Sequence, residues 1–516
     1  MNIASLLQQQ AERFGDRPAI IERGRRITFA ALDRAAASAA ADLSAAGLTT
    51  GMRALVFSPM SIALYTTIIG LFRLGVTAVF VDPSAGWARL DSCVARVRPA
   101  AFVAVPSAHL LRLTSAAIRS VAIKLAIGGG LPGVRAVGRH VSNVTGAIAP
   151  AEADTPAIIT FTSGSTGEPK AAVRTHGFLM AQHRALVESL ALAAGQVDLT
   201  TLPVFLLANL ASGVTSVIPD ADLRAPGAIV AAPVLEQIRA HRPTRTVASP
   251  AFLDRLVQAK GTDTRLDTFR HIFTGGAPVF PVMLDALAAL APEAAVVAVY
   301  GSTEAEPISE IDRRAIGSAD RLAMQQGAGL LTGMPAPSIQ LRILPDRWGT
   351  PVGPWRVDDL DRQSLPDGMV GEIVVSGEHV LTGYLDGRGD EETKIRIGDR
   401  TWHRTGDAGY LDQQGRLWLL GRCSAKVSDG DGVLYPFAVE CAASDVPGVH
   451  RSAFVLHRDQ RILVVESREN TASPRDGLMT RLVWARLADV LAVRHIPVDR
   501  RHNAKVDYPA LQRMLG

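Results

Sequence analysis

The sequence predicts an α/β protein, with a large N-terminal domain of mostly parallel, helix-covered sheets and a small C-terminal α+β domain. A chain of 516 residues is too long for one ordinary domain. Its content of 47% hydrophobic and 20% charged residues is typical of a folded globular protein. Strand-like and helix-like patterns alternate through much of the N-terminal part, which indicates βαβ units and a mostly parallel sheet.

The N-terminal part begins with an amphipathic helical pattern over 3–14 and a hairpin pattern with strands at 18–21 and 26–29. Further helices are expected at 30–46, 62–74, 108–119, 176–193, 233–241 and 250–259. Strands are expected at 53–58, 76–81, 101–105, 246–248, 271–274 and 295–299. The apolar stretches 202–209 and 214–219 are expected to be buried.

The C-terminal part has a different pattern. Strands are expected at 372–375, 402–407 and 417–420. Beyond them the chain reads as a small α+β domain, with strands at 452–456 and 462–466 and a helix at 479–491.

The longest uncharged run, 54–72, has the length to cross a bilayer. Pro59 and several Ser and Thr residues interrupt it, so a buried strand followed by a core helix explains it better. We therefore expect no transmembrane segment, and peripheral membrane contact through another surface is left open.

Composition excludes several classes of protein. The formal net charge is only +4 and no dense Lys/Arg block occurs, so a nucleic-acid partner is not expected. Cys93, Cys423 and Cys441 form no CxxC pair and no metal-ligand spacing. The N-terminus lacks the pattern of a signal peptide. The expected location is the cytoplasm.

One polar stretch has more order than a surface loop, which is its plainer interpretation. A short strand is expected over 157–159, just before it. Its hydroxyl residues and glycines are interleaved and end in a proline and a lysine: Thr160, Phe161, Thr162, Ser163, Gly164, Ser165, Thr166, Gly167, Glu168, Pro169 and Lys170. Glycines let backbone N–H groups point inward together, and hydroxyls and an ammonium add donors, so phosphate is the predicted guest.

Two better-known phosphate loops do not fit the chain. The NTPase P-loop needs Gly before its lysine and Ser or Thr after it, whereas Pro169 and Ala171 flank Lys170. A dinucleotide fingerprint occurs at Gly128–Gly133, but Pro132 stands where a helix should be starting. We interpret Gly128–Gly133 as a loop.

Two later strands also lead into glycine-containing segments. The strand at 271–274 precedes Gly275–Pro278, and the strand at 295–299 precedes a loop over Tyr300–Glu304. In doubly wound sheets ligands gather at the carboxyl ends of strands. Ordinary glycine turns are the alternative, but three such segments in this order favour a ligand site.

The stretch Thr160–Lys170 resembles the phosphate-loop motif of the adenylate-forming (ANL, AMP-binding) superfamily. That group includes acyl-CoA synthetases, peptide-synthetase adenylation domains and luciferases. The glycine that usually follows the lysine is Ala171 here. The resemblance implies that the chain binds ATP with Thr162, Ser163, Gly164, Ser165, Thr166, Gly167 and Lys170.

The same resemblance covers the later segments. It implies that the adenine is lined by Gly275, Gly276, Ala277 and Pro278, and that Tyr300, followed by Gly301 and Ser302, stacks on the base. Thr303 matches the residue that contacts the α-phosphate. Glu304 matches the Mg²⁺ ligand, a hard oxygen donor; taken alone, it would be a solvated carboxylate.

Asp407 matches the aspartate that binds the ribose hydroxyls, although alone it would suit an Asx turn. Gly421-Arg422 resembles the hinge between the two domains, which gives an AMP-binding domain at 1–420 and a mobile C-terminal domain at 421–516. Arg422 matches an arginine that contacts ribose or phosphate. Lys505 occupies the place of the superfamily's catalytic lysine, with Asn503 just before it; the alternative is a surface lysine, in a chain that has only six lysines.

The finer resemblance is to the OleC-type olefin β-lactone synthetases. It rests on four stretches: Ser216–Asp220, Trp402–Asp412, Gly421–Ser424 and Arg501–Lys505. Ser424 departs from the wider superfamily but fits this subgroup. Leu206 stands where many acyl-CoA synthetases have a histidine.

The resemblance implies an ATP- and Mg²⁺-dependent ligase that converts a carboxylic acid, expected to be a long-chain 3-hydroxy acid, into an acyl-adenylate and then a β-lactone. A fatty acyl-CoA ligase or transfer to a carrier protein supplied in trans is the alternative, so a need for coenzyme A is left open. Other enzymes of a hydrocarbon or lactone pathway are candidate partners. A nucleotide sensor without catalysis is the hypothesis from another class, and the retained Thr303, Glu304, Asp407 and Lys505 argue against it.

Overall fold

The protein is described from a computed structural model. It describes residues 1–82, 86–138, 147–162, 169–259, 265–467, 473–499 and 504–516. These residues form two compact units. The first comprises 1–220 and 383–390, and the second comprises 221–382 and 391–516.

The first unit is built on a mostly parallel sheet with the order β7-β6-β5-β3-β4-β8-β9. Only the edge strand β9 runs antiparallel to its neighbour. The strands are β3 (Arg53–Phe57), β4 (Thr77–Phe80), β5 (Ala101–Ala104), β6 (Ile123–Ala126), β7 (Arg135–Ala136), β8 (Pro156–Thr162) and β9 (Lys170–Thr175). The central strands are almost wholly buried and apolar, as parallel strands between helical layers are.

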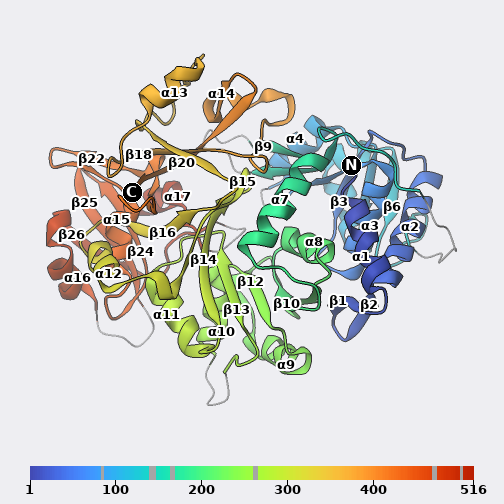
Figure 1. Ribbon diagram of the computed structural model, residues 1–516, viewed down its shortest axis with the longest axis horizontal. Coiled ribbons are helices and arrows are strands. Elements are labelled where there is room, and N and C mark those ends of the chain that lie inside the picture. The colour runs from blue at the N-terminus through green and yellow to red at the C-terminus, as the bar shows by residue number, and fades with distance from the viewer. Residues whose placement is uncertain (83–85, 139–146, 163–168, 260–264, 468–472, 500–503) are drawn as a thin grey trace. The chain divides into compact units, whose positions relative to one another are not determined.

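The uncharged run 54–72 forms a strand and a core helix, as the sequence predicts. After β3, Ser61 accepts a hydrogen bond from the Leu64 N–H and so begins α3 (Ile62–Leu74). This helix ends at Gly75, whose φ of +69° suits glycine. It lies beside α2 (Phe29–Ala45) (Figure 1). Among the described residues, no helix combines the length and apolarity that a bilayer crossing requires.

A second sheet of the first unit has the local order β10-β11-β1-β2. Its strands are β10 (Val197–Thr200), β11 (Thr215–Ile218), β1 (Pro18–Glu22) and β2 (Arg25–Thr28). The helices α1 (Ala4–Phe14), α7 (His176–Ser189) and α8 (Pro203–Ala211) accompany it. The buried Asn209 amide on α8 donates to Asp198 Oδ2 (2.7 Å) and Ser216 Oγ (3.1 Å), which fixes α8 to β10 and β11.

The second unit begins with parallel strands and continues antiparallel, in the order β12-β13-β14-β15-β16-β21-β20-β18-β17, with β19 paired to β20. The strands are β12 (Arg245–Ala248), β13 (His271–Gly275), β14 (Ala295–Ser302), β15 (Ala305–Asp312), β16 (Leu330–Pro335), β17 (Gln340–Leu344), β18 (Gly371–Ser376), β19 (Lys394–Ile397), β20 (Arg400–Leu411) and β21 (Leu417–Arg422). Helices of this part include α9 (Ala231–His241), α10 (Pro250–Val257), α11 (Pro281–Leu290), α12 (Ser318–Gln325) and α13 (Val357–Gln363), and α10 lies beside α11.

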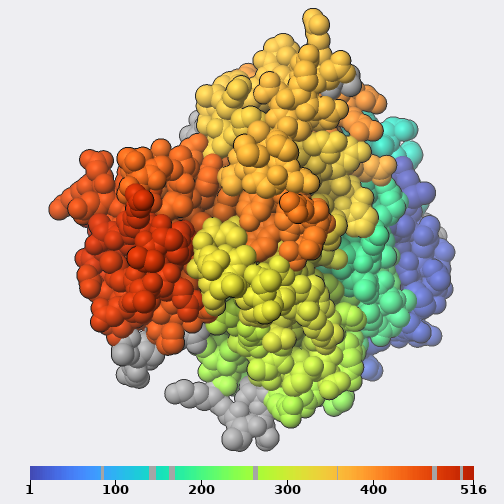
Figure 2. All heavy atoms as spheres, turned by 60° about the vertical axis from the view of Figure 1, so that its left-hand side comes forward, coloured from blue at the N-terminus to red at the C-terminus, as the bar shows by residue number. Residues whose placement is uncertain are grey.

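The C-terminal residues fold around a small sheet, β24-β25-β26, and form one compact lobe, red in Figure 2. The strands are β24 (Val449–His457), β25 (Gln460–Ser467) and β26 (Asp489–Val493), and the helices are α15 (Pro436–Ala443), α16 (Arg475–Arg481) and α17 (Tyr508–Leu515). The predicted α/β class with a small α+β C-terminal part is therefore confirmed.

Two predicted helices are wrong in part. The helix expected over 479–491 ends at Arg481, and Asp489–Val493 instead forms β26, parallel to β25. The helix expected over 108–119 is broken into a 3₁₀ turn and two short helices, α5 (Leu111–Thr114) and α6 (Ala116–Ser120). Ser115 has extended φ/ψ angles and caps α6, which explains the break.

Candidate active site

The β14–β15 hairpin carries five of the residues to which the sequence assigns contacts with the nucleotide or its metal: Tyr300, Gly301, Ser302, Thr303 and Glu304. The sequence predicts a loop after Val299, but β14 continues through Ser302 and pairs with β15 at Ala305. Thr303 and Glu304 therefore form the tip of the hairpin. Gly301 favoured a loop in the sequence. The strand forms because these residues pair with β15, which lies later in the chain.

The segment after β13 depends on glycine at two positions. A Cβ on Gly275 would lie 2.4 Å from the carbonyl oxygen of Val299 on the neighbouring β14. Gly276 has a φ of +80°, which L side chains rarely adopt. The two strands can thus approach closely at their carboxyl ends, with Ala277 and Pro278 following in the turn.

Tyr300, Asp407 and Arg422 come together in the second unit. The Tyr300 hydroxyl donates to Asp407 Oδ2 at 2.7 Å. The Arg422 Nε lies 3.2 Å from Asp407 Oδ1, and its Nη1 donates to the Thr405 carbonyl at 3.0 Å. Since Asp407 and Arg422 are direct partners between β20 and β21, the sheet register itself sets this ion pair.

The charges of this cluster stabilise one another. Burial raises the pKa of Tyr300 well above its usual value, and the carboxylate of Asp407 adds to the effect. The same carboxylate raises the pKa of Arg422. Tyr300 therefore remains a hydrogen-bond donor and Arg422 a cation at neutral pH. A carboxylate has about four lone-pair positions, so Asp407 can still accept from ribose hydroxyls.

A buried ion pair supports the strand that carries Asp407. Arg404 on β20 and Glu372 on β18 are each only 1% exposed, and Arg404 Nη2 lies 2.6 Å from Glu372 Oε2. Arg404 Nη1 also donates to the Thr350 carbonyl at 2.7 Å. Sequence reasoning gave Arg404 and Thr405 no role. The sequence did contain an indication of the pair: an arginine within a strand that is predicted to be buried needs a buried acidic partner.

Two residues of the predicted phosphate loop, Thr162 on β8 and Lys170 on β9, lie in the first unit. They are opposite each other in the antiparallel register. Lys170 is buried, with its Nζ 5.8 Å from the Tyr384 ring centroid. The candidate residues Ser163, Gly164, Ser165, Thr166 and Gly167 lie outside the described residues.

The segment that carries Lys505 is tied to the C-terminal lobe on both sides. The Lys505 N–H donates to Asp499 Oδ1 at 3.0 Å, and the Asp499 N–H donates to the Lys505 carbonyl at 2.8 Å. Just beyond, the Tyr508 hydroxyl donates to Glu440 Oε1 at 2.6 Å. No sequence pattern indicated Asp499, Tyr508 or Glu440. Asp499 binds a backbone N–H, and Tyr508 and Glu440 bind each other although they are far apart in the chain.

Glu304 fits a magnesium ion that is held mainly by phosphate. Mg²⁺ keeps several waters and commonly takes one or two carboxylates together with substrate phosphates. Among the described residues no cluster of three or more His, Cys, Asp or Glu side chains forms an all-protein cage. The half-buried Glu304, at a hairpin tip beside a proposed phosphate contact, supplies the single carboxylate that such a site needs.

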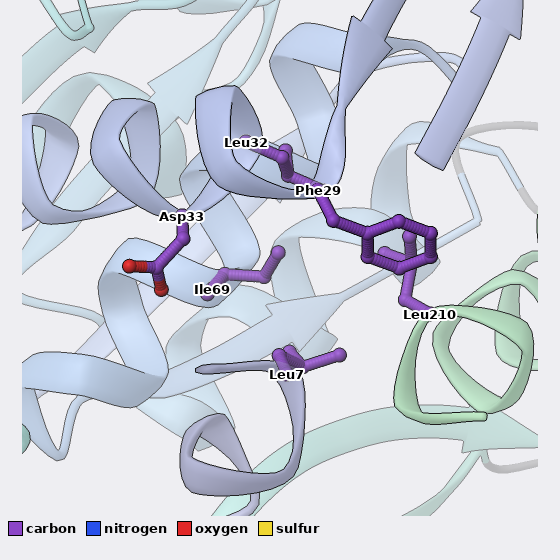
Figure 3. Close-up of a pocket in the computed structure, with 6 residues that line it drawn as sticks. All are labelled: Leu7, Phe29, Leu32, Asp33, Ile69 and Leu210. Atoms are coloured by element: carbon purple, nitrogen blue, oxygen red, sulfur yellow. The ribbon is translucent and has the colours of Figure 1, made fainter. Parts of the chain in front are cut away.

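One cavity of the first unit is too small to hold an organic ligand. Figure 3 shows it between α1, α2, α3 and α8, lined by Leu7, Phe29, Leu32, Asp33, Ile69 and Leu210. Its volume is about 10 Å³. That is roughly the space of one water molecule, so the cavity is a packing gap.

Known proteins resemble this chain along its length. A family model described as "AMP-binding enzyme" matches residues 7–385. An olefin beta-lactone synthetase of Stenotrophomonas maltophilia (strain K279a) is 32% identical, with 98% of this chain and 96% of the relative covered. A second, from Xanthomonas campestris pv. campestris, is 31% identical, with 93% of this chain and 89% of the relative covered.

A solved structure confirms the fold. ATP-bound MatB from Rhodopseudomonas palustris superposes with a TM-score of 0.80 at 23% identity, covering 100% of this chain and 99% of that one. Together, the match of the family model to most of the chain and the full-length relatives establish that this chain belongs to the AMP-binding enzyme family.

Proposed function

We propose that this chain uses ATP to activate a 3-hydroxy carboxylic acid as its acyl-adenylate, and then closes the acid to a β-lactone with release of AMP. The full-length similarity to two proteins named olefin beta-lactone synthetases is the observation that carries the lactone step. The Tyr300–Asp407–Arg422 cluster supports the nucleotide site.

In the first step, an oxygen of the substrate carboxylate bonds to the α-phosphorus of ATP, and the bond from that phosphorus to the bridging oxygen breaks. Pyrophosphate leaves. Because an anion approaches a polyanion, positive charge and donors must offset the repulsion. We assign this task to Lys170, Lys505 and the hydroxyl of Thr303. A magnesium ion on Glu304 would neutralise phosphate charge.

The adenosine part would be held by the second unit. The adenine would lie against Gly275–Pro278 and the Tyr300 ring, because bases stack well on aromatic rings. Asp407 would accept from the ribose hydroxyls, with Arg422 holding its carboxylate in place. These assignments follow the resemblance to the family, residue by residue.

In the second step, the oxygen of the substrate's own 3-hydroxyl bonds to the acyl carbon and loses its proton, while the bond to AMP breaks. The reaction is intramolecular, so an enzyme that holds the substrate bent keeps the hydroxyl close to the acyl carbon, and no second substrate has to be bound and oriented. Leu206, which is buried on α8, replaces the histidine of many acyl-CoA synthetases, which favours a route without coenzyme A.

A pair of matched substrates tests this proposal. A long-chain 3-hydroxy acid and the same acid without the hydroxyl are each incubated with ATP and Mg²⁺, without coenzyme A. Both acids should support ATP–pyrophosphate exchange, but only the hydroxy acid should give continuous AMP release. Continuous AMP release from both acids would refute ring closure, and absence of exchange with either would refute adenylation.

We also propose that the boundary at 420/421 separates the AMP-binding domain from a C-terminal domain that carries Lys505. The cytoplasm is the proposed location, because Cys93, Cys423 and Cys441 are free, buried thiols, as expected in a reducing compartment.

A further inference from the structure

Lys394, a lysine of the second unit, is buried and is linked through Leu381 to the hairpin tip that carries Thr303 and Glu304. Lys394 on β19 is 5% exposed, and its ammonium donates to the carbonyl of Leu381. Its Nζ also lies 3.2 Å from Nδ1 of His403, its partner on β20. Burying an ammonium is costly unless hydrogen bonds replace its water, so this arrangement calls for an explanation.

Leu381 connects Lys394 to the hairpin tip. While its carbonyl accepts from Lys394, its N–H donates to the carbonyl of Glu304 at 2.7 Å. The preceding residue, Val380, forms an isolated bridge with Ala305 on the other side of the tip. The backbone of the tip is therefore held by 380–381, and that segment is held in turn by a buried cation.

A purely structural role for Lys394 would be to pair with the Leu381 carbonyl and with Nδ1 of His403, with no effect on the hairpin tip. The chain is rich in arginine and keeps only six lysines, yet it places one here, linked to Glu304 through the backbone of Leu381. The hydrogen bonds thus link the Lys394 ammonium to the backbone that positions the Glu304 carboxylate.

We propose that Lys394 is a positioning residue of the adenylating site, which fixes Thr303 and Glu304 through Leu381 so that the Glu304 carboxylate meets magnesium and the Thr303 hydroxyl meets phosphate. The inference rests on the proposed function for the identity of those ligands. The hydrogen bonds from Lys394 to Leu381 and from Leu381 to Glu304, called the relay below, do not depend on the proposed function.

Two variants separate the bond from the charge. K394M removes both, whereas K394Q keeps an amide donor for the Leu381 carbonyl without the charge. K124M is the matched control, because Lys124 also donates to backbone carbonyls, those of Arg119 and Val121, but belongs to no proposed site.

The first measurement is hydrogen exchange of the protein without nucleotide or metal. In K394M the Leu381 amide should exchange at least roughly tenfold faster, because its segment loses its anchor, whereas K394Q and K124M should resemble the wild type. The second is the Mg²⁺ concentration for half-maximal ATP–pyrophosphate exchange. It should rise roughly tenfold in K394M, as when a residue supporting a metal ligand is removed.

The outcomes distinguish the possibilities. If K394M melts at a lower temperature but keeps both the Leu381 exchange rate and the Mg²⁺ dependence, Lys394 is only structural and the inference is overturned. If K394M does not fold, a K394Q variant with unaltered Leu381 exchange and Mg²⁺ dependence supports the relay, and a changed Leu381 rate in K394Q contradicts it. Wild-type protein without any exchange activity would refute the proposed function, while the Leu381 amide would still test the relay.

Discussion

Asp407 holds two partners at once, the Tyr300 hydroxyl on one oxygen and Arg422 on the other. Such a carboxylate is already oriented before a nucleotide arrives, which reduces the ordering that binding requires. The sequence could identify all three residues by their motifs. Their mutual contacts could not be predicted, because strands β14, β20 and β21 meet through a register that only the folded sheet defines.

The Tyr300 ring and hydroxyl can be tested separately. Tyr300→Phe keeps the ring and loses one hydrogen bond to a charged acceptor, so the free energy of unfolding should fall by about 1.5–3 kcal/mol while the KM for ATP changes little. Tyr300→Ala should raise that KM strongly. Tyr410→Phe, which loses a bond from β20 to the Ala328 carbonyl just before β16, is the control and should leave the KM unchanged. A Tyr300→Ala variant with wild-type KM would contradict the stacking role.

Lys505 should matter for chemistry and not for folding. Lys505→Ala removes a half-buried side chain from a segment that is held by backbone bonds to Asp499, so its melting temperature should stay near the wild-type value. Its rate of ATP–pyrophosphate exchange should fall about 10²–10³-fold, as when one preorganised donor is removed. Near-normal exchange would show that another residue stabilises the transition state.

At the scale of elements, the strand β20 combines structure and function. It carries the buried Arg404 and also Asp407, which contacts Tyr300 and Arg422. The sequence pattern predicted this strand over 402–407. The β14–β15 hairpin was missed because Gly301 suggests a turn locally. The helix over 479–491 was wrong because apolar spacing alone does not reveal a parallel partner such as β25.

The Arg404–Glu372 pair should stabilise the fold strongly. Arg404→Met leaves Glu372 without its cation in a buried site, so the free energy of unfolding should fall by about 3–5 kcal/mol. Arg475→Met is the control, since Arg475 pairs with Asp489 at an exposed site and should cost at most about 1 kcal/mol. Denaturant unfolding of both variants measures the difference, and equal losses would contradict the argument from burial.

At the scale of the whole molecule, the sequence predicted alternating parallel strands first and a small α+β lobe last, and the family match agrees. The spacing of hydrophobic residues and the positions of glycines are enough to predict this order of elements. They do not reveal side-chain links between distant segments, such as Glu440 on α15 with Tyr508 on α17. That link ties the end of the Lys505 segment to the C-terminal lobe.

Because Glu440 is buried beside Tyr508, the stability of the C-terminal lobe should depend on pH. Burial raises the pKa of Glu440 from 4.5 to about 7. The folded chain therefore keeps a proton that the unfolded chain releases, so this contribution to stability is complete below about pH 4.5 and is lost as the pH rises through about 7. Glu440→Gln should abolish this part of the pH dependence in denaturant unfolding.

Tyr508→Phe provides the matched comparison. The Tyr508 hydroxyl bond lowers the pKa of Glu440 in opposition to burial, so its removal should shift the loss of stability to higher pH. A wild-type profile in both variants would show that Glu440 does not titrate in this range.

The central claim is that one active site makes an acyl-adenylate and then a four-membered lactone. It is tested most directly by NMR of the products formed from ATP, Mg²⁺ and a long-chain 3-hydroxy acid, with and without coenzyme A. We predict a β-lactone and AMP in both reactions. A thioester that forms only with coenzyme A, and no lactone in either reaction, would contradict the account.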